Sequence, residues 1–326
     1  MQNTETELEL TVLLAVVSGE QAVRENLTAL TRQIDFEKAE IIVPFDKWSS
    51  GVGTLVLEFP GVRFHYIDDL GFAEDESISV HQHRLYDRRR AVGLMLSRGR
   101  IVAMTEDHAL PAEDWVKQIV AVHEQPYDVI GGAVENGLDR PLNWAWYYCD
   151  FGRYGRPFDR GEVLFVSDVN LSYKRSALTA TYDLWHEFYQ EAAVHWAMLA
   201  RGGQLFLDDR PVVFQMRPRL KFGQAMRERV NWGRVFAETR ANNLTNLYRF
   251  LFSIGTLLLP LIMSSRVLGH MRRQGQTLIT MITTLPIAFL FLVGWSAGEF
   301  LGYLLATPNR GQGISDVLDE AKANSV

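Results

Sequence analysis

Two long apolar runs near the C-terminus constrain the fold of this chain more than any other feature. Each run contains a single charged side chain: Arg249 lies in residues 247–263 (LYRFLFSIGTLLLPLIM), and Glu299 lies in residues 278–306. A transmembrane helix needs about 20 apolar residues, so the first run is barely long enough to cross a bilayer and the second is longer than a straight crossing requires. The pair predicts a C-terminal transmembrane helical hairpin. A shallow or re-entrant first segment is the alternative.

Basic residues around these runs indicate their orientation. Between Arg217 and Arg273 the arginines and lysines far outnumber the acidic residues, and three arginines lie in the connection between the runs. Positive charge favours the cytoplasmic side, and the segment before the first run is the richer one. We therefore expect both ends of the hairpin and the large domain to lie in the cytoplasm, at the cell inner membrane. The mixture of aromatic residues and arginines over 217–246 predicts a basic amphipathic segment in the membrane interface, in contact with lipids.

The second apolar run carries a strip of small residues. Gly294, Gly298 and Gly302 recur every four residues, so a second helix can approach closely along this face. Packing against the first apolar run of the same chain is the simpler interpretation. A homo-oligomer that associates through these glycines is the alternative.

Charge and cysteine content exclude several classes of protein. The formal net charge of −6 at pH 7 argues against a nucleic-acid partner. Cys149 is the only cysteine, so neither an intrachain disulfide nor a cysteine zinc cluster can form. The N-terminal sequence MQNTETELEL lacks the basic-then-apolar order of a signal peptide. These features fit a reducing compartment.

Strand and helix patterns alternate through the first two thirds of the chain. Apolar, β-rich runs at 10–17, 41–43, 62–67, 101–104 and 129–134 alternate with amphipathic stretches at 20–33, 86–97 and 115–123. This order predicts an α/β domain with a mostly parallel, helix-covered sheet. We assign residues 1–216 to this domain, 217–246 to the interfacial segment, 247–306 to two membrane helices and 307–326 to a polar tail.

Ligands of such sheets bind beyond the carboxyl ends of the strands, so the residues that follow each strand are the candidates for ligand binding. Ser18 and Glu20 follow the first strand, where a helix amino end could face phosphate or ribose. Asp46 follows the second strand and could bind a base or ribose, or simply form an Asx turn.

Glu106, Asp107 and His108 follow the strand at 101–104. Acidic residues at a strand end can hold a divalent cation that bridges a diphosphate, and a neutral imidazole suits manganese better than magnesium. An acidic surface turn is the competing interpretation.

Several segments resemble family 2 glycosyltransferases of the GT-A (Rossmann-like) fold. The segments RAVG (90–93), RGRIVA (98–103) and EDH (106–108) occur in the order of the family pattern "ARNxGxxxxxGxIVAFxD" and its DDD or DxD motif. The segment DVNLSYKR (168–175) is similar to the family's "GANLAYRR", and 190–202 is similar to its "ED", helix and closing glycine. The resemblance covers about residues 9–240. Glu106 and His108 stand where the family usually has aspartates, and Gln190-Glu191 replaces Glu-Asp.

This resemblance implies a hexosyltransferase-type enzyme of the membrane-anchored bacterial kind. It would move a sugar, with inversion, from a nucleotide-sugar donor to a lipid-linked or saccharide acceptor in cell-envelope polysaccharide synthesis, using a divalent metal (Mn or Mg). A catalytically degenerate GT-A-like membrane scaffold or binding subunit is the alternative.

The resemblance also implies roles for individual residues. Glu191, at the start of a helix, is the predicted general base, and Glu187, one turn earlier, is the fallback. Arg90 is the donor-binding arginine, whereas Arg88 and Arg89 are interpreted as an exposed helix face. The remaining predicted groups are donor-binding Ser18, Glu20, Asp46, Glu106 and Asp107; the metal ligands Glu106, Asp107 and His108; and the acceptor-side residues Asp168 and Asn170.

Overall fold

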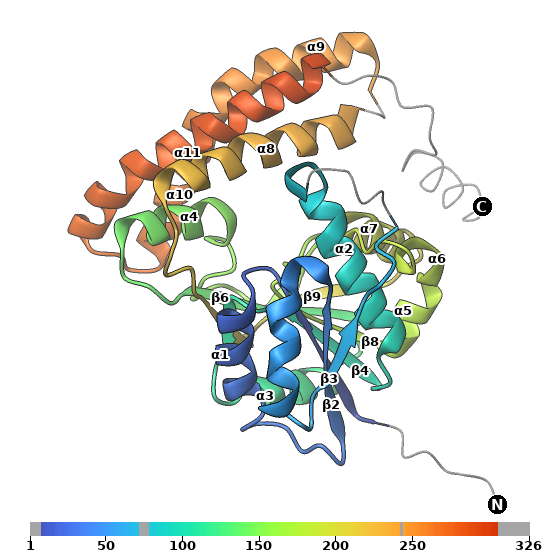
Figure 1. Cartoon of the computed structure of the whole chain (residues 1–326). Helices are drawn as coiled ribbons and strands as arrows, with labels where there is room; N and C mark the ends of the chain where they lie inside the picture. Colours follow the sequence, from blue (N-terminus) through green and yellow to red (C-terminus); the bar gives the residue numbers. More distant parts are fainter. Residues whose placement is uncertain (1–7, 72–77, 242–243, 306–326) are drawn as a thin grey trace, which may run out of the picture. The chain divides into compact units, whose positions relative to one another are not determined.

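The structure is a computed structural model that describes residues 8–71, 78–241 and 244–305. The chain divides into two compact units (Figure 1). The first comprises Met1–Val134 and Asp159–Phe214, and the second comprises Glu135–Phe158 and Gln215–Val326. The sequence did not indicate that residues 135–158 belong with the C-terminal helices.

The first unit is built on a mixed sheet, which has nine strands within the described residues. Its strand order is β3-β2-β1-β4-β8-β6-β9-β5, with β7 paired to β9. The β1, β2, β3 and β4 strands are mutually parallel, and β8 runs antiparallel to both β4 and β6. The strands are β1 (Leu10–Ala15), β2 (Ala39–Phe45), β3 (Arg63–Tyr66), β4 (Ile101–Glu106), β5 (Ala109–Pro111), β6 (Val129–Asn136), β7 (Gly161–Glu162), β8 (Asn170–Lys174) and β9 (Leu205–Gln215).

The central strands are apolar on both faces because helices cover both faces of the sheet. Every residue of β1, β2 and β4 is buried, as expected for parallel strands inside an α/β domain. The predicted strands and helices of this region are confirmed with shifts of one to three residues at their ends, except that α2 begins at Ile78 and not at residue 86. The helices are α1 (Glu20–Leu30), the 3₁₀ helix η1 (Lys47–Leu57), α2 (Ile78–Leu96), α3 (Trp115–Val122), α5 (Arg175–Ala180), α6 (Tyr182–Trp185) and α7 (Glu191–Ala200).

Gly99 explains one of the motif glycines. A Cβ atom at this position would lie 2.3 Å from the backbone nitrogen of Thr11 and 2.5 Å from the carbonyl carbon of Leu10. No side chain fits there, because the chain entering β4 passes directly against the backbone of β1. Gly99 therefore permits the β1–β4 pairing whose carboxyl ends carry the candidate site.

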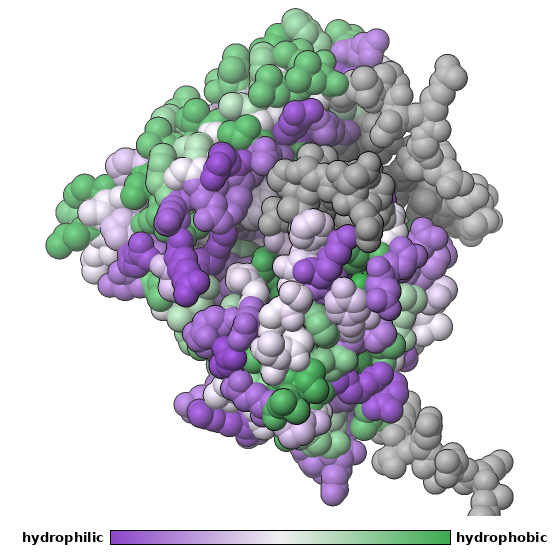
Figure 2. Space-filling view, in the orientation of Figure 1, coloured by the Kyte–Doolittle hydropathy of each residue, from purple (hydrophilic) through white to green (hydrophobic). Residues whose placement is uncertain are grey.

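The second unit is helical. It contains α4 (Pro141–Asp150), α8 (Phe222–Ala241), α9 (Asn246–Gly255), the 3₁₀ turn η2 (Thr256–Leu258), α10 (Leu259–Arg273) and α11 (Leu278–Leu305). Two continuous helical stretches, Asn246–Arg273 and Leu278–Leu305, are long and apolar enough to cross a membrane by length and composition. They form a hairpin, and apolar residues gather over these helices (Figure 2).

The glycine strip of α11 packs against α8. A Cβ atom on Gly298 would lie 2.0 Å from the carbonyl oxygen of Val230, and one on Gly302 would lie 2.5 Å from that of Arg234. The intramolecular packing predicted for the strip occurs, but its partner is the basic helix and not the first apolar run. Because α8 of the same chain fills this face, a second copy of the protein would have to use another one.

Candidate active site

The turn that follows β1 is closed by the carboxylate of Asp107. Its Oδ2 accepts hydrogen bonds from the backbone amides of Val17 at 3.0 Å, Ser18 at 2.8 Å and Gly19 at 2.9 Å, and its Oδ1 accepts a second one from Ser18 at 3.0 Å. Gly19 has a φ of 103°, in the region that favours glycine. The amino end of α1, where a phosphate was expected to bind, therefore already holds the side chain of Asp107.

Arg90 joins three distant segments of the sequence into one buried cluster. Its guanidinium on α2 contacts the carboxylate of Glu106 at the end of β4 and lies 2.8 Å from Asp168, which precedes β8. Asp87 lies 3.8 Å away on the same helix. Three of the residues predicted from the sequence, Arg90, Glu106 and Asp168, are thus brought together at the carboxyl end of the parallel strands.

Burial and charge perturb the titration of this cluster. Burial raises the pKa of Asp87 to about 7, with Arg90 acting in the opposite direction and Asp168 adding to the rise. Burial likewise raises the pKa of Asp168, opposed by Arg90. The pKa of Arg90 is raised despite its burial, because Asp168, Glu106 and Asp87 surround it. The cluster holds protons as well as charges near neutral pH.

His108 lies between two carboxylates. Its Nε2 is 2.9 Å from Glu106 and its Nδ1 is 3.4 Å from Asp107. Burial alone would lower the pKa of His108, but Glu106 and Asp107 outweigh this effect and raise it to about 9. The imidazole is therefore protonated at neutral pH, and it forms ion pairs with both neighbours.

The predicted metal ligands do not fit a divalent ion in this arrangement. His108 is paired with Glu106 and Asp107, Glu106 faces the two cations Arg90 and His108, and Asp107 is used by three backbone amides. No group of three or more His, Cys, Asp or Glu side chains with a metal-binding arrangement occurs among residues 8–71, 78–241 and 244–305. The triplet that was expected to hold the ion is instead an ion-pair cluster.

Asp46 and Glu20 lie beside this region but have partners of their own. Asp46 is fully buried and is bound by the Arg89 guanidinium at 2.6 and 2.9 Å, and it also caps η1 through the amide of Trp48 at 2.8 Å. Glu20 is partly exposed and pairs with Arg24 at 2.8 Å. The Asx-type role that competed with donor binding at Asp46 is the one the contacts favour.

The interpretation of Arg89 as part of an exposed helix face is wrong, because only 3% of its surface is exposed. Besides Asp46, it donates to the carbonyl oxygen of Val16 at 2.5 Å, at the end of β1. A signal was present in the sequence: Arg89 lies four residues after Leu85 and three before Val92, both buried on the same side of α2.

Glu191 is the first residue of α7 and is partly exposed. Its carboxylate lies 3.9 Å from Nδ1 of His195, one turn along the helix. The Nε2 of His195 lies 2.7 Å from the hydroxyl of Tyr173 on β8, which lies 2.5 Å from the hydroxyl of Tyr189. Burial lowers the pKa of His195 to about 4, so this buried chain of polar groups is neutral where it approaches Glu191.

Glu187 and Asn170 lie in surroundings that the sequence did not predict. Glu187 was placed one turn earlier on the helix of Glu191, but α7 begins only at Glu191, and Glu187 projects into solvent with 74% of its side chain exposed. Asn170 is fully buried: its amide donates to the carbonyl oxygens of Ala133 and Pro211 at 2.8 and 3.0 Å, and its oxygen accepts from Trp115 at 2.9 Å. These bonds use both amide hydrogens of Asn170, which braces the sheet, and its role toward the acceptor stays a prediction.

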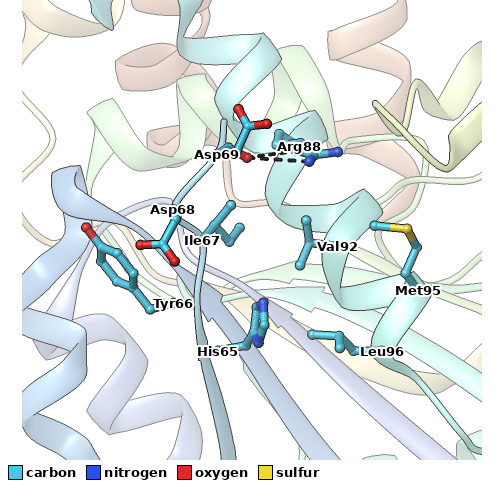
Figure 3. Close-up of a pocket in the computed structure, with 9 residues that line it drawn as sticks. All are labelled: His65, Tyr66, Ile67, Asp68, Asp69, Arg88, Val92, Met95 and Leu96. Atoms are coloured by element: carbon cyan, nitrogen blue, oxygen red, sulfur yellow. Dashed lines mark hydrogen bonds between the residues drawn. The ribbon is translucent and has the colours of Figure 1, made fainter. Parts of the chain in front are cut away.

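A separate pocket of about 330 Å³ opens at the carboxyl end of β3, between this edge strand and α2 (Figure 3). Arg88 lies on its wall and donates to the carbonyl oxygen of Asp69 at 3.4 Å. None of the residues predicted for donor, acceptor or catalysis lines it. Its walls are formed by His65, Tyr66, Ile67, Asp68, Asp69, Arg88, Val92, Met95 and Leu96.

Comparison with known proteins gives matches among solved structures. No protein-family model and no curated protein matches this sequence. The mannosyltransferase PcManGT from Pyrobaculum calidifontis, solved with GDP-Man and Mn2+, matches with 14% identity over 97% of this chain and 80% of its own, at a TM-score of 0.45. S. aureus TarS 1-349 matches with 12% identity over 90% of this chain and 91% of its own, also at 0.45.

Proposed function

We propose that this protein is an inverting hexosyltransferase of the GT-A fold, which moves a sugar from a nucleotide-sugar donor to a lipid-linked or saccharide acceptor during cell-envelope polysaccharide synthesis. One observation carries the proposal. Arg90, Glu106 and Asp168 come from three segments that resemble separate motifs of family 2 glycosyltransferases, and they meet in one cluster at the carboxyl ends of the parallel strands. Ligands of such sheets bind at that edge.

In this proposal Glu191 is the general base. Its carboxylate accepts the proton of the acceptor hydroxyl while the hydroxyl oxygen attacks the anomeric carbon, and the bond from that carbon to the diphosphate oxygen breaks. The position at the first residue of α7 and the partly exposed carboxylate support this role. The neutral His195 supports it too, because a cationic neighbour would make Glu191 a weaker base.

The departing nucleoside diphosphate needs positive charge nearby. The manganese or magnesium ion implied by the family resemblance would have to displace Arg90 and His108 from Glu106. We assign this role to the protonated His108 and to Arg90, whose contacts with Glu106 a bound diphosphate would replace in part. His108 also lies 3.4 Å from the hydroxyl of Ser18, at the turn after β1 where a phosphate was expected.

We further propose that the apolar hairpin attaches the enzyme to the cell inner membrane, with the α/β unit in the cytoplasm. The two long apolar helices support attachment to a membrane, and the arginine-rich segment before them supports the orientation. A lipid-linked acceptor would then keep its chain in the bilayer while its head group reaches the enzyme.

The first experiment measures thermal unfolding of the detergent-purified full chain with UDP, GDP, CDP and dTDP, each with EDTA, manganese or magnesium. A ligand that binds only the folded state raises the unfolding temperature by an amount that grows with its concentration. We expect a rise with one nucleotide, and we expect it to persist in EDTA. If no nucleotide raises the unfolding temperature under any condition, the donor site is refuted and the scaffold alternative takes its place.

A sugar-transfer assay with the matching donor then tests the base. We expect Glu191→Gln to keep the nucleotide-induced rise but to lower turnover by about 10²- to 10⁴-fold, the usual contribution of general base catalysis. Glu187→Gln is the matched control and should keep turnover within about twofold, because an exposed carboxylate away from the reaction contributes little. Full turnover by Glu191→Gln would exclude Glu191 as the base.

A further inference from the structure

The helical unit leaves a long apolar surface uncovered. Along α11, large apolar side chains are exposed from Ile279 near one end to Leu304 near the other, and α9 and the start of α10 expose a second row (Figure 2). A continuous apolar surface of this extent marks contact with a membrane or a partner. The exposed residues include Leu247, Phe250, Leu251, Leu257 and Leu261 on one stretch and Ile279, Ile282, Phe289, Leu290, Val293 and Leu301 on the other.

The second half of α11 cannot enter a bilayer without α8. Glycines on both helices allow backbone contact: besides the strip on α11, a Cβ atom on Gly233 of α8 would lie 2.2 Å from the carbonyl oxygen of Trp295. The two helices run side by side along this length (Figure 1). α8 also carries the exposed side chains of Arg227 and Arg234, and the guanidinium of Arg240 lies 4.4 Å from the ring centre of Phe252 on α9. Charged side chains of this kind are costly in hydrocarbon. A crossing α11 would draw these arginines into the membrane.

A buried ion pair lies beside the middle of α11. Arg229 of α8 donates to Asp150 at the end of α4 at 2.5 Å, and its guanidinium carbon lies 6.0 Å from the ring centre of Phe291. Phe291 is near the midpoint of the 28-residue helix. In a helix that crosses the membrane this point would lie at the centre of the bilayer, where ion pairs carried by a second and third helix are least favourable.

The tip of the hairpin is tied to residues 148–155. Gln274 donates to the carbonyl oxygen of Gly152 at 2.9 Å and accepts from the Tyr148 hydroxyl at 2.9 Å, and Arg273 donates to Gly155 at 3.2 Å. Residues 151–160 have no helix or strand and lead directly into β7, whereas α4 spans ten residues, about 15 Å. Irregular chain does not traverse hydrocarbon and α4 is too short to do so, so the tip lies on the same side of the membrane as the sheet.

We propose that the hairpin lies along the surface of the bilayer, with α9, α10 and α11 parallel to the membrane plane and their exposed apolar side chains immersed to a depth of about 5–10 Å. The exposed arginines of α8 and Arg266, Arg272 and Arg273 of α10 then lie at the level of the phosphate head groups. The protein is held on one face of the membrane and does not cross it. The inference is independent of the sugar-transfer activity, because it uses only the contacts of the helical unit.

Spin-label depth measurements on the full chain test this orientation. Single cysteines replace Ile282, Phe289, Val293 and Leu301 in a Cys149→Ala background, in vesicles of phosphatidylcholine and phosphatidylglycerol in equal parts. All four side chains are exposed, so the substitutions should leave packing intact, which unfolding temperatures verify. We expect four similar, shallow depths, with a label at Glu37 in water as the reference. A maximum of depth at Phe289 and Val293, with shallow values at the ends, would overturn the proposal.

The side on which the tip lies is tested separately by labelling sealed vesicles with a membrane-impermeant maleimide. Arg272→Cys reports on the tip and Glu37→Cys on the α/β unit, since both positions are exposed. We expect the two variants to be labelled to the same extent before detergent is added. In a hairpin that crosses twice, the tip would be protected wherever the α/β unit is accessible, and that result would also refute the proposal.

Discussion

Asp107 provides a direct test of whether the acidic motif is structural or metal-binding. Removing its carboxylate in Asp107→Ala leaves the backbone amides of Val17, Ser18 and Gly19 without their acceptor. A hydrogen bond to a charged group contributes about 1.5–3 kcal/mol, but Ser18 is exposed, so water can replace part of the loss. We therefore expect the free energy of unfolding to fall by about 2–4 kcal/mol.

Thermal unfolding in the presence of EDTA measures this effect without a contribution from metals. For a unit of this size, about 1 kcal/mol corresponds to roughly 2–4 °C, so the unfolding temperature of Asp107→Ala should fall by roughly 4–16 °C. Asp107→Asn keeps one acceptor oxygen and should lie between Ala and the parent. Asp114→Asn is the matched control: this exposed aspartate bonds only to Gln118 in the described contacts, and it should change stability by less than about 0.5 kcal/mol.

A metal ligand would behave differently. If Asp107 bound an ion that the free protein lacks, its substitution would leave stability in EDTA unchanged or raise it, because ligands often carry strain or repulsion. The substitution Asp107→Ala would then abolish only the rise in unfolding temperature that a bound metal causes. An Asp107→Ala protein as stable as the parent in EDTA would refute the assignment of this carboxylate as the clamp of the β1–α1 turn.

Three further predictions concern the cluster and its support. The ion pairs of His108 should stabilise the fold fully below about pH 6.5, and this stabilisation should be lost as the pH rises from about 6.5 through about 9. The unfolding temperature of the parent should therefore fall over this pH range, and that of His108→Gln should fall less. Because burial raises the pKa of Asp87 from 3.8 to about 7, its carboxyl group lowers stability progressively as the pH rises from about 4 to about 7, and the loss is constant above that. Asp87→Asn should therefore stabilise the protein at about pH 8, by at most about 4 kcal/mol, and hardly at pH 4, as thermal melts at both values will show. Asn170→Ala should destabilise by about 2–4 kcal/mol through its lost buried hydrogen bonds while leaving the acceptor KM unchanged; a raised KM would restore its predicted acceptor role.

The fold of the α/β unit was largely predictable because its signals are local. A run such as LTVLLA in β1 is apolar on both faces, which is typical of a buried parallel strand and needs no knowledge of its neighbours. The β9 strand was missed for the opposite reason. In its sequence LFLDDRPVVFQ, charged residues and a proline interrupt the apolar pattern of a strand. Asp208 is buried because Arg210 binds it at 2.7 Å, and a contact of this kind cannot be read from the hydrophobic pattern.

The candidate site was predictable in its location but not in its chemistry. The strand ends identify the edge of the sheet where Glu106 and Asp168 lie, because parallel strands align their carboxyl ends. Whether a carboxylate binds a metal, an arginine or backbone amides depends on which donors the fold brings within 3 Å. Asp46 and Asp107 were both interpreted as ligand-binding groups, yet each is used by its own protein, Asp46 by Arg89 and Asp107 by the turn after β1.

The helical unit shows the same limit on a larger scale. Hydropathy measures how apolar a segment is, and both apolar runs are long enough to cross a bilayer. It does not measure what lies beside them. The periodicity of Gly294, Gly298 and Gly302 predicts a close contact with another helix but does not identify that helix. The identity of the partner determines whether α11 can cross a membrane. Had the strip met the first apolar run, α11 could have crossed the membrane with it; since it meets the arginine-bearing α8, the same apolar length is better suited to lying along the membrane surface.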